Sequence, residues 1–252
     1  GFDRRFCNRT GGACGTTAPS GYFFSDSTRP FDDHGLRPTM MLGVATEEDG
    51  RALVDRGVAA DDTFPAGDGY FLRTTDAARS VRWPVFERMP GLWDHEGGLR
   101  LFYRDAVDGD DEALLRDTDD VLVYQTGFAN VADIDTNTYL PGAVADHLTS
   151  FGGRVPDAGG QMSVTRWLEA GATGSYGTAL EPCNFTDKFP DPRALLATYF
   201  RGATLVEAYW KSVNWPGEGV FVGEPLARPW GAQEARVEGD TLVLETNVLA
   251  PR

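Results

Sequence analysis

Four side chains in the middle of the chain could perform nucleophilic catalysis: Cys183, His147, Glu181 and Ser150. A thiolate attacks a carbonyl when an imidazole takes its proton, so Cys183 with His147 as base would suit a cysteine hydrolase. Glu181 or Asp146 would orient the imidazole ring. Cys183 precedes a predicted helix, and a helix N-terminus lowers the pKa of a thiol. The alternative is that Cys183 is a small buried hydrophobic residue without a chemical role.

Ser150 offers a second route to the same chemistry. It stands just before Gly152 and Gly153, whose backbone N–H groups could stabilise an oxyanion. The base would have to be His147, three residues before the serine. On an extended strand these two side chains face opposite ways, and only a helical turn would bring them together. The competing interpretation of Ser150 is a polar residue that caps a turn.

The segment "DIDTN" carries oxygen-bearing side chains on alternate residues, Asp133, Asp135 and Asn137. Such spacing suits Ca²⁺, as in the opening of an EF-hand loop. The glycine and the terminal glutamate of an EF-hand loop are missing, so we expect either another kind of Ca²⁺ site or a solvated acidic turn. His34 and His95 also lie beside carboxylates, and only the fold could collect them at a transition-metal site.

The composition indicates an acidic domain with a substantial core. The 252 residues carry a formal net charge of −15, with 41% hydrophobic and 12% aromatic residues. This charge argues against nucleic acid and anionic membrane surfaces as general partners. No apolar run approaches the roughly 18 residues of a membrane span. The chain begins at Gly1 without a basic-then-apolar leader, so we expect a removed signal segment, a fragment of a longer product, or both.

The three cysteines bear on the cellular compartment. Cys7 and Cys14 flank a short glycine-containing loop that a disulfide could close. That pairing would leave Cys183 as the odd cysteine and would imply an oxidising environment. Two free thiols in an irregular arm are the alternative. We therefore expect a protein that is secreted, periplasmic or attached to the cell surface.

Alternating strand and helix patterns predict an α/β fold with a mostly parallel, doubly wound sheet and helices on both faces. The predicted strands are 39–45, 69–75, 99–105, 121–127 and 172–180, and the predicted helical stretches are 47–61, 76–89, 160–171 and 191–213. Residues 142–153 fit either a strand or the start of a helix.

Changes in composition divide the chain into three parts. Residues 1–37 form an irregular N-terminal arm, residues 38–230 the α/β domain, and residues 231–252 a C-terminal β-hairpin or tail. In doubly wound sheets, ligands bind beyond the carboxyl ends of the strands. The predicted cleft is therefore built from the loops at 46–48, 75–80, 127–137, 149–160 and 179–190.

Four long motifs lie within residues 37–230: "RPTMMLGVATEEDGRALVDRGVAADDTFP", "LPGAVADHLTSFGG", "GQMSVTRWLEAGATGSYGTALEPCNFTDKFPDP" and "GATLVEAYWKSVNWPGEGVFVGEPLARPW". They closely resemble a family of uncharacterised, mostly bacterial secreted proteins. A more distant resemblance links the chain to gingipain-type cysteine peptidases, which have the caspase-like fold. It rests on the order of "SFGG" after a strand, "SYG" in a strand, "TLVEAYW" in a helix, and Gly223-Glu224-Pro225 near the end.

The resemblance implies a caspase-like, flavodoxin-like layering and a His/Cys dyad at the ends of two strands. The chain departs at both places, with "QTGFANV" where the family has His-Gly and Thr149, Ser150 and Phe151 where it has the nucleophilic Cys. We expect a scaffold without this dyad that binds a peptide, glycan or protein partner in its cleft. The alternatives are an active hydrolase using Cys183 with His147, or a subunit of an extracellular assembly, including a homo-oligomer.

Overall fold

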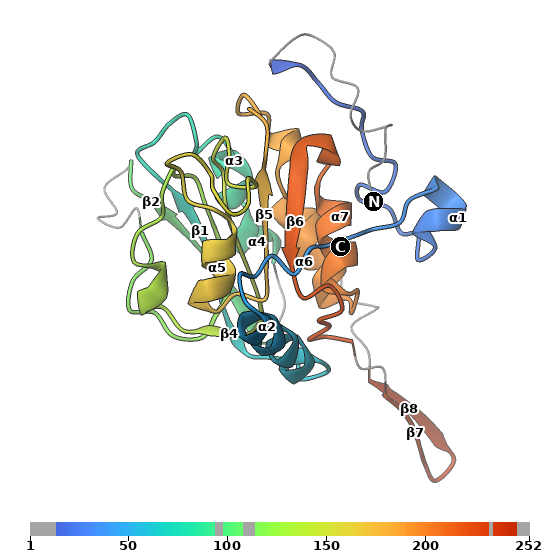
Figure 1. Ribbon diagram of the computed structural model, residues 1–252. Helices are drawn as coiled ribbons and strands as arrows, with labels where there is room; N and C mark the ends of the chain where they lie inside the picture. The colour runs from blue at the N-terminus through green and yellow to red at the C-terminus, as the bar shows by residue number, and fades with distance from the viewer. Residues whose placement is uncertain (1–13, 94–97, 108–113, 232–233, 246–252) are drawn as a thin grey trace.

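A six-stranded sheet forms the centre of the computed structural model, which describes residues 14–93, 98–107, 114–231 and 234–245 (Figure 1). Its strands lie in the order β2-β1-β3-β4-β5-β6. They are β1 (Gly67–Arg73), β2 (Leu99–Asp105), β3 (Val121–Thr126), β4 (Tyr139–His147), β5 (Gly174–Thr178) and β6 (Gly219–Gly223). Strands β1 to β5 are parallel, and β6 runs antiparallel to β5. The predicted α/β fold with a mostly parallel sheet is confirmed.

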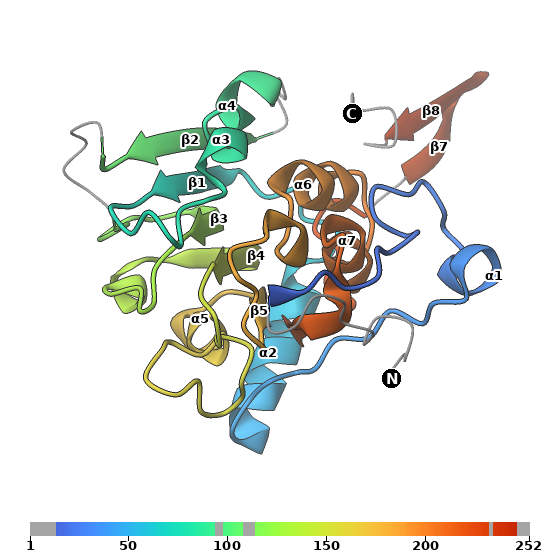
Figure 2. The same cartoon turned by 90° about the horizontal axis from the view of Figure 1, so that it is seen from above.

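Helices cover both faces of this sheet (Figure 2). The helices are α1 (Pro30–His34), α2 (Glu47–Ala60), α3 (Trp83–Phe86), α4 (Met89–Leu92), α5 (Thr165–Ala170), α6 (Pro192–Phe200) and α7 (Leu205–Ser212), with 3-10 turns at Ile134–Thr136, Thr186–Lys188 and Pro216–Glu218. Helices α3, α4, α6 and α7 contribute to the core on one face, and α5 to the core on the other. Within the described residues, no helix is long and apolar enough to cross a lipid bilayer.

Strand alternation decides which core each side chain enters, because successive side chains point to opposite faces. In β1, Phe71 lies in the core under α3 and α6, while Tyr70 and Leu72 lie in the core under α5. In β4, the same alternation places Asp146 on the α6 face and His147 on the α5 face. These two adjacent residues therefore have different surroundings, which bears on the site below.

The predicted strand at 39–45 is wrong. Only Met41 pairs with the sheet, through an isolated bridge to Val222 in β6. The side chains of Met41 and Leu42 are 47% and 40% exposed. This apolar run covers the outer edge of β6 instead of entering the sheet, so its hydrophobicity reflects edge protection rather than a central position.

Three other elements show how local signals act. Helix α2 begins after Thr46, whose Oγ1 accepts a hydrogen bond from Asp49 N at 3.1 Å, the usual contact of an N-cap residue. Of the predicted helical stretch 76–89, only residues 83–86 form a helix, α3, and α4 begins at Met89; Pro84 sits in the first turn of α3, where a proline is tolerated. Strand β6 is an element that the sequence patterns do not indicate.

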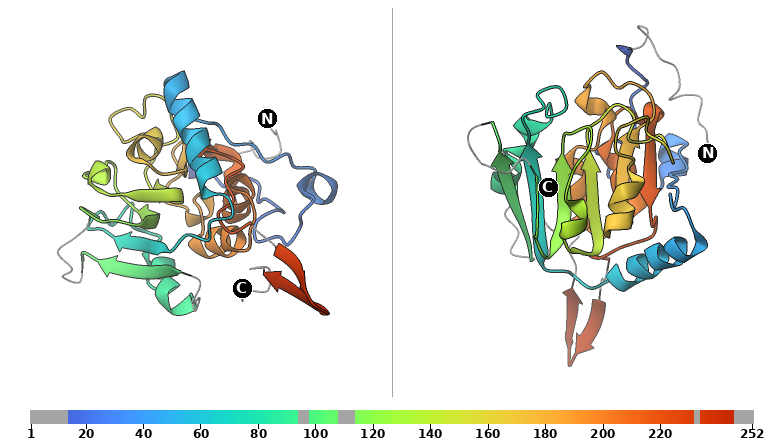
Figure 3. Two further views of the ribbon diagram at one scale, coloured as in Figure 1. Left: turned by 90° about the horizontal axis from the view of Figure 1, so that it is seen from below. Right: turned by 60° about the vertical axis from the view of Figure 1, so that its left-hand side comes forward.

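Two segments lie outside the sheet and its helices. The arm before α2 runs beside α7, where Phe24 N donates to Lys211 O. Strands β7 (Glu234–Glu238) and β8 (Thr241–Glu245) form an antiparallel pair, which projects from the body of the molecule (Figure 3).

Candidate functional site

Cys183 forms a disulfide with Cys14, across 169 residues of sequence. The predicted Cys7–Cys14 disulfide is therefore wrong, and Cys7 lies outside the described residues. The arm passes over the loop after β5, where Lys188 Nζ donates to Gly15 O at 3.0 Å. This contact explains why Cys14 meets a cysteine so distant in the chain. A disulfide sulfur is not a thiolate, so Cys183 cannot act as a nucleophile while it is bonded to Cys14.

His147 is completely buried between the sheet and α5. Its Nδ1 accepts a hydrogen bond from Trp167 Nε1 at 2.9 Å, which leaves Nε2 to donate to the carbonyl oxygen of Met162 at 3.1 Å. Burial lowers the pKa of His147 to about 3, so the ring is neutral at ordinary pH. Because both ring nitrogens are engaged, His147 is not placed to act as a base for Cys183 or Ser150.

Glu181 and Ser150 take part in local backbone contacts. Glu181 Oε1 accepts from the backbone N–H of Cys183 at 2.9 Å. The carbonyl oxygen of Ser150 accepts from Thr178 Oγ1 at 3.1 Å. The N–H of Gly153 donates to Thr178 O at 2.9 Å, so it is not available to stabilise an oxyanion. In the part of the chain that the structure describes, His147, the base predicted for both nucleophiles, is bonded through its two ring nitrogens to Trp167 and Met162 instead.

The side chains predicted to bind Ca²⁺ have protein partners instead. Asp133 pairs with Arg116 and Asp135 with Arg166, at 2.7 and 2.8 Å. The Asn137 amide bonds to backbone groups of the preceding loop. Among the residues that the structure describes, no three His, Cys, Asp or Glu side chains are placed to hold a metal ion. His34 bonds to Ser25 at 3.1 Å, and His95 is outside the described residues.

The loops at the carboxyl ends of the strands do meet, as the parallel sheet requires. Thr74 Oγ1 donates to the carbonyl of Gly127 at 2.7 Å, joining the loops after β1 and β3. Arg79 Nε donates to Thr149 Oγ1 at 3.1 Å, and Thr149 Oγ1 donates to Gln161 at 2.8 Å. A Cβ on Gly127 would collide with the carbonyl of Arg79, so only glycine fits there. This end of the sheet is filled by its own hydrogen bonds.

A buried ion pair lies beneath these loops on the α6 face. Arg82 and Asp146 have side chains only 2% and 1% exposed, and Arg82 Nη1 lies 2.7 Å from Asp146 Oδ1. Gln125 Nε2 donates to Asp146 Oδ2 at 2.7 Å, and Arg82 Nη2 donates to Thr126 O at 2.8 Å. No local sequence pattern indicates Arg82, but Asp146 places a carboxylate inside an apolar strand, and a buried carboxylate requires a cation beside it.

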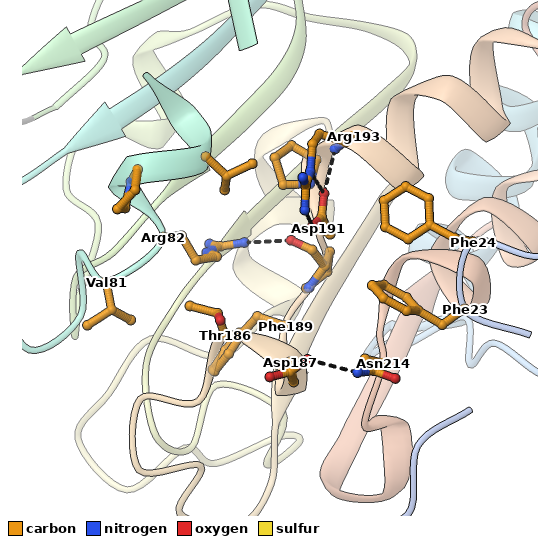
Figure 4. A pocket seen from close by; sticks show the side chains of 14 residues that line it. Phe23, Phe24, Val81, Arg82, Thr186, Asp187, Phe189, Asp191, Arg193 and Asn214 are labelled. Atoms are coloured by element: carbon orange, nitrogen blue, oxygen red, sulfur yellow. Dashed lines mark hydrogen bonds and ion pairs between the residues drawn. The ribbon is translucent and has the colours of Figure 1, made fainter. Parts of the chain in front are cut away.

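A pocket of about 350 Å³ opens beside this ion pair (Figure 4). Its walls come from the arm, the residues around α3, the loop before α6, and the residue after α7. They are Phe23, Phe24, Val81, Arg82, Pro84, Val85, Thr186, Asp187, Phe189, Pro190, Asp191, Pro192, Arg193 and Asn214. We call this the arm pocket. Part of its wall belongs to the predicted cleft loop 179–190, but the predicted catalytic side chains do not line it.

Some charged side chains of the arm pocket have an oppositely charged partner and others do not. Arg193 pairs with Asp191, and the hydrogen bond between them raises the pKa of Arg193 above its usual range. The charge of Arg82 is balanced by Asp146. Asp187 accepts a hydrogen bond from Asn214 at 2.8 Å, and no ion pair of the described residues involves it. The pocket therefore carries one carboxylate without a cation beside it.

Comparison with known proteins gives no information about function, so the geometry described above is the basis for a proposal. No protein-family model matches the chain, and neither a curated protein nor a solved structure shows significant similarity to it.

Proposed function

We propose that the chain is a secreted, non-catalytic binding protein that holds an extended peptide segment of a protein partner in the arm pocket. The scaffold proposed is caspase-like, related to gingipain-type peptidases but without their dyad. The strand order, with β1 to β5 parallel and β6 reversed, supports this layering. The Cys14–Cys183 disulfide supports an extracellular or periplasmic location, since disulfides persist in oxidising compartments.

The observation that carries the proposal is an exposed aromatic ring held at the rim of the arm pocket. Phe24 is 48% exposed and has a φ of 52°, which is uncommon for a bulky residue. Its N–H is fixed by the carbonyl of Lys211 at 3.0 Å. Strained backbone and exposed aromatic surface are features that binding sites retain despite their cost in stability.

The walls of the arm pocket favour a peptide over a glycan. Phenylalanine, proline and valine side chains supply most of its surface and suit an apolar side chain of the ligand. Asp187 supplies a carboxylate for a neighbouring lysine or arginine. The net charge of −15 also attracts a basic segment at long range. The ligand class is therefore a peptide with an apolar residue next to a basic one.

The hydrolase alternative needs a free thiol at Cys183, and Cys183 supplies none while its disulfide with Cys14 is intact.

Fluorescence anisotropy with labelled peptides tests the proposed function. A short peptide library with apolar–Lys pairs should bind, and the matched apolar–Glu library should bind at least about tenfold more weakly, as expected for a charge-assisted contact. Phe24→Ala and Asp187→Asn should each weaken binding. The control is Phe31→Ala, because Phe31 is also an exposed ring, at 50%, but does not line the pocket. Equal binding of both libraries, or no difference between Phe24→Ala and the control, would overturn the proposal.

A further inference from the structure

A second hollow follows α6 away from the arm pocket. It consists of a pocket of about 320 Å³ along the middle of the helix and one of about 480 Å³ at its C-terminal end. Both pockets are lined by Ser25, Asp26, Thr198 and Arg201, so they lie next to each other, and we call the two together the α6 trough. Each volume falls in the roughly 300–1,000 Å³ range of small-molecule sites.

The first half of the α6 trough is apolar. Its walls include Met89, Leu92 and Trp93 from α4 and its end, and Ala197 from α6. Leu92 is 60% exposed, so together with Trp93 it presents apolar surface to the cavity. Trp93 is fixed in place, because its Nε1 donates to Leu99 O at 3.2 Å and its ring packs edge-on against Phe200. This half is a mainly apolar slot, although the charged side chains of Asp26 and Arg193 also line it.

The second half of the α6 trough is cationic. Arg201, Lys211 and Arg228 line it, against the two carboxylates of Asp26 and Glu207. Glu207 is committed to its own helix, because its Oε2 accepts from both the N–H and the hydroxyl of Thr204 at the start of α7. The local excess of positive charge stands out in a chain whose formal net charge is −15.

Arg201 lines both halves of the trough and therefore stands where the chemistry changes from apolar to cationic. A guanidinium presents two parallel N–H groups to a carboxylate, which gives both affinity and orientation. A ligand that satisfies both halves has an apolar body and one anionic end, in that order along the helix.

We propose that the α6 trough binds a small amphipathic carboxylate, a medium-chain fatty acid in its simplest form. The hydrocarbon chain lies in the slot beside Trp93 and Ala197, and the carboxylate lies on Arg201. This site is separate from the peptide site proposed above and does not depend on it, although Phe24 and Arg193 line both hollows.

Isothermal titration calorimetry of the full chain with sodium decanoate tests the proposal. Decanoate should bind with one site per chain. Decyltrimethylammonium, with the same hydrocarbon chain and the opposite charge, and acetate, with the carboxylate alone, should each bind at least about tenfold more weakly. Because these comparisons use the unaltered protein, equal binding of decanoate and decyltrimethylammonium would overturn the proposal without any variant.

Two variants locate the site. Arg201→Gln should weaken decanoate binding about tenfold or more, and Ala197→Phe should block it by filling the slot. Arg51→Gln is the matched control, because it removes an arginine that is 75% exposed on α2 and should leave binding unchanged. Circular dichroism checks that the variants fold. Unaltered decanoate affinity in folded Arg201→Gln would contradict the proposal.

The peptide libraries, measured on Arg201→Gln, separate the two sites. Peptide binding that persists while decanoate binding is lost assigns them to different hollows. Failure of decanoate alone overturns only the trough, and failure of the peptides alone overturns only the arm pocket.

Discussion

The carboxyl end of the sheet and the flank of α6 are built in opposite ways. At the sheet end, Arg82 and Asp146 are at most 2% exposed and bonded to each other, and His147 has partners on both ring nitrogens. Along α6, the side chains of Phe24 and Leu92 are 48% and 60% exposed beside open hollows. The groups that look catalytic in the sequence hold the fold together, while the space for a ligand lies beside them.

This contrast shows why residue types alone are a poor guide to function here. A histidine, a carboxylate and an arginine near strand ends suggest acid–base chemistry. Once each is buried and held by an ion pair or hydrogen bonds to its neighbours, moving any of them would leave a neighbour unsatisfied. The flank of α6 carries few such groups, but its surfaces are accessible. Four measurements test whether the two regions differ in this way.

The largest effect should come from removing the buried negative charge at the sheet end. Asp146→Asn leaves the Arg82 guanidinium buried without its counter-ion, and we expect a loss of about 3–5 kcal/mol in the free energy of unfolding. Urea denaturation measures it. The control Asp135→Asn breaks an exposed pair with Arg166 and should cost less than about 1 kcal/mol. Equal losses in the two variants would remove the distinction between the sheet end and the surface.

The disulfide should have the next largest effect. The double variant Cys14→Ser/Cys183→Ser should lose about 2–5 kcal/mol, because the cross-link closes a long loop in the unfolded chain. Cys7→Ser is the control and should keep the wild-type stability. Peptide mapping without reductant should recover a Cys14–Cys183 cross-linked peptide. Recovery of a peptide joining Cys7 to Cys14 would refute the arrangement of the arm described above.

His147 should make stability depend on pH in a specific window. Its pKa is about 3 in the folded chain against an ordinary value of 6.5, so the unfolded chain takes up a proton that the folded chain does not. Stability is therefore lost as pH falls below 6.5, by about 2 kcal/mol from this residue between pH 8 and pH 5. His147→Gln should lack this component, and the half-buried His34→Gln should retain it. Urea denaturation at both pH values measures the difference, and an unchanged dependence in His147→Gln would contradict the burial of its ring.

The smallest effect should separate stability from binding. Thr149→Ala removes the hydroxyl that links Arg79 to Gln161, and we expect a loss of about 1 kcal/mol with unchanged peptide binding. Asp187→Asn should do the reverse, with stability nearly unchanged and binding weakened. A loss of peptide binding in Thr149→Ala would mean that the sheet end and the arm pocket act as one site.

The sequence predicts three neighbouring strands of this fold well, from the edge strand β2 to the central strand β3. The runs that become β1, β2 and β3 are apolar, rich in aromatic and β-branched residues, and bounded by turn residues, so the prediction of these strands is confirmed within a few residues. The run 39–45 has the same local character, but the sheet accepts only Met41 from it. Strand β6 has five residues, of which two are glycines, and gives too little local signal.

The candidate site is less predictable, for a geometric reason. Which of two neighbours, Asp146 or His147, meets Arg82 depends on the face to which each points, and the pairing of β4 with β3 fixes that. The partner of Cys183 likewise depends on the path of an arm that has no periodic pattern. The arm pocket combines segments from four parts of the chain, and no local spacing could indicate it.

The Cys14–Cys183 bond has a consequence for any protease that meets this protein. The strands β1 to β5 lie between the two cysteines in sequence. A single cut anywhere in that interval would leave both pieces covalently joined. Nicked molecules would therefore migrate with the intact protein until a reductant is added, and only then separate into two fragments.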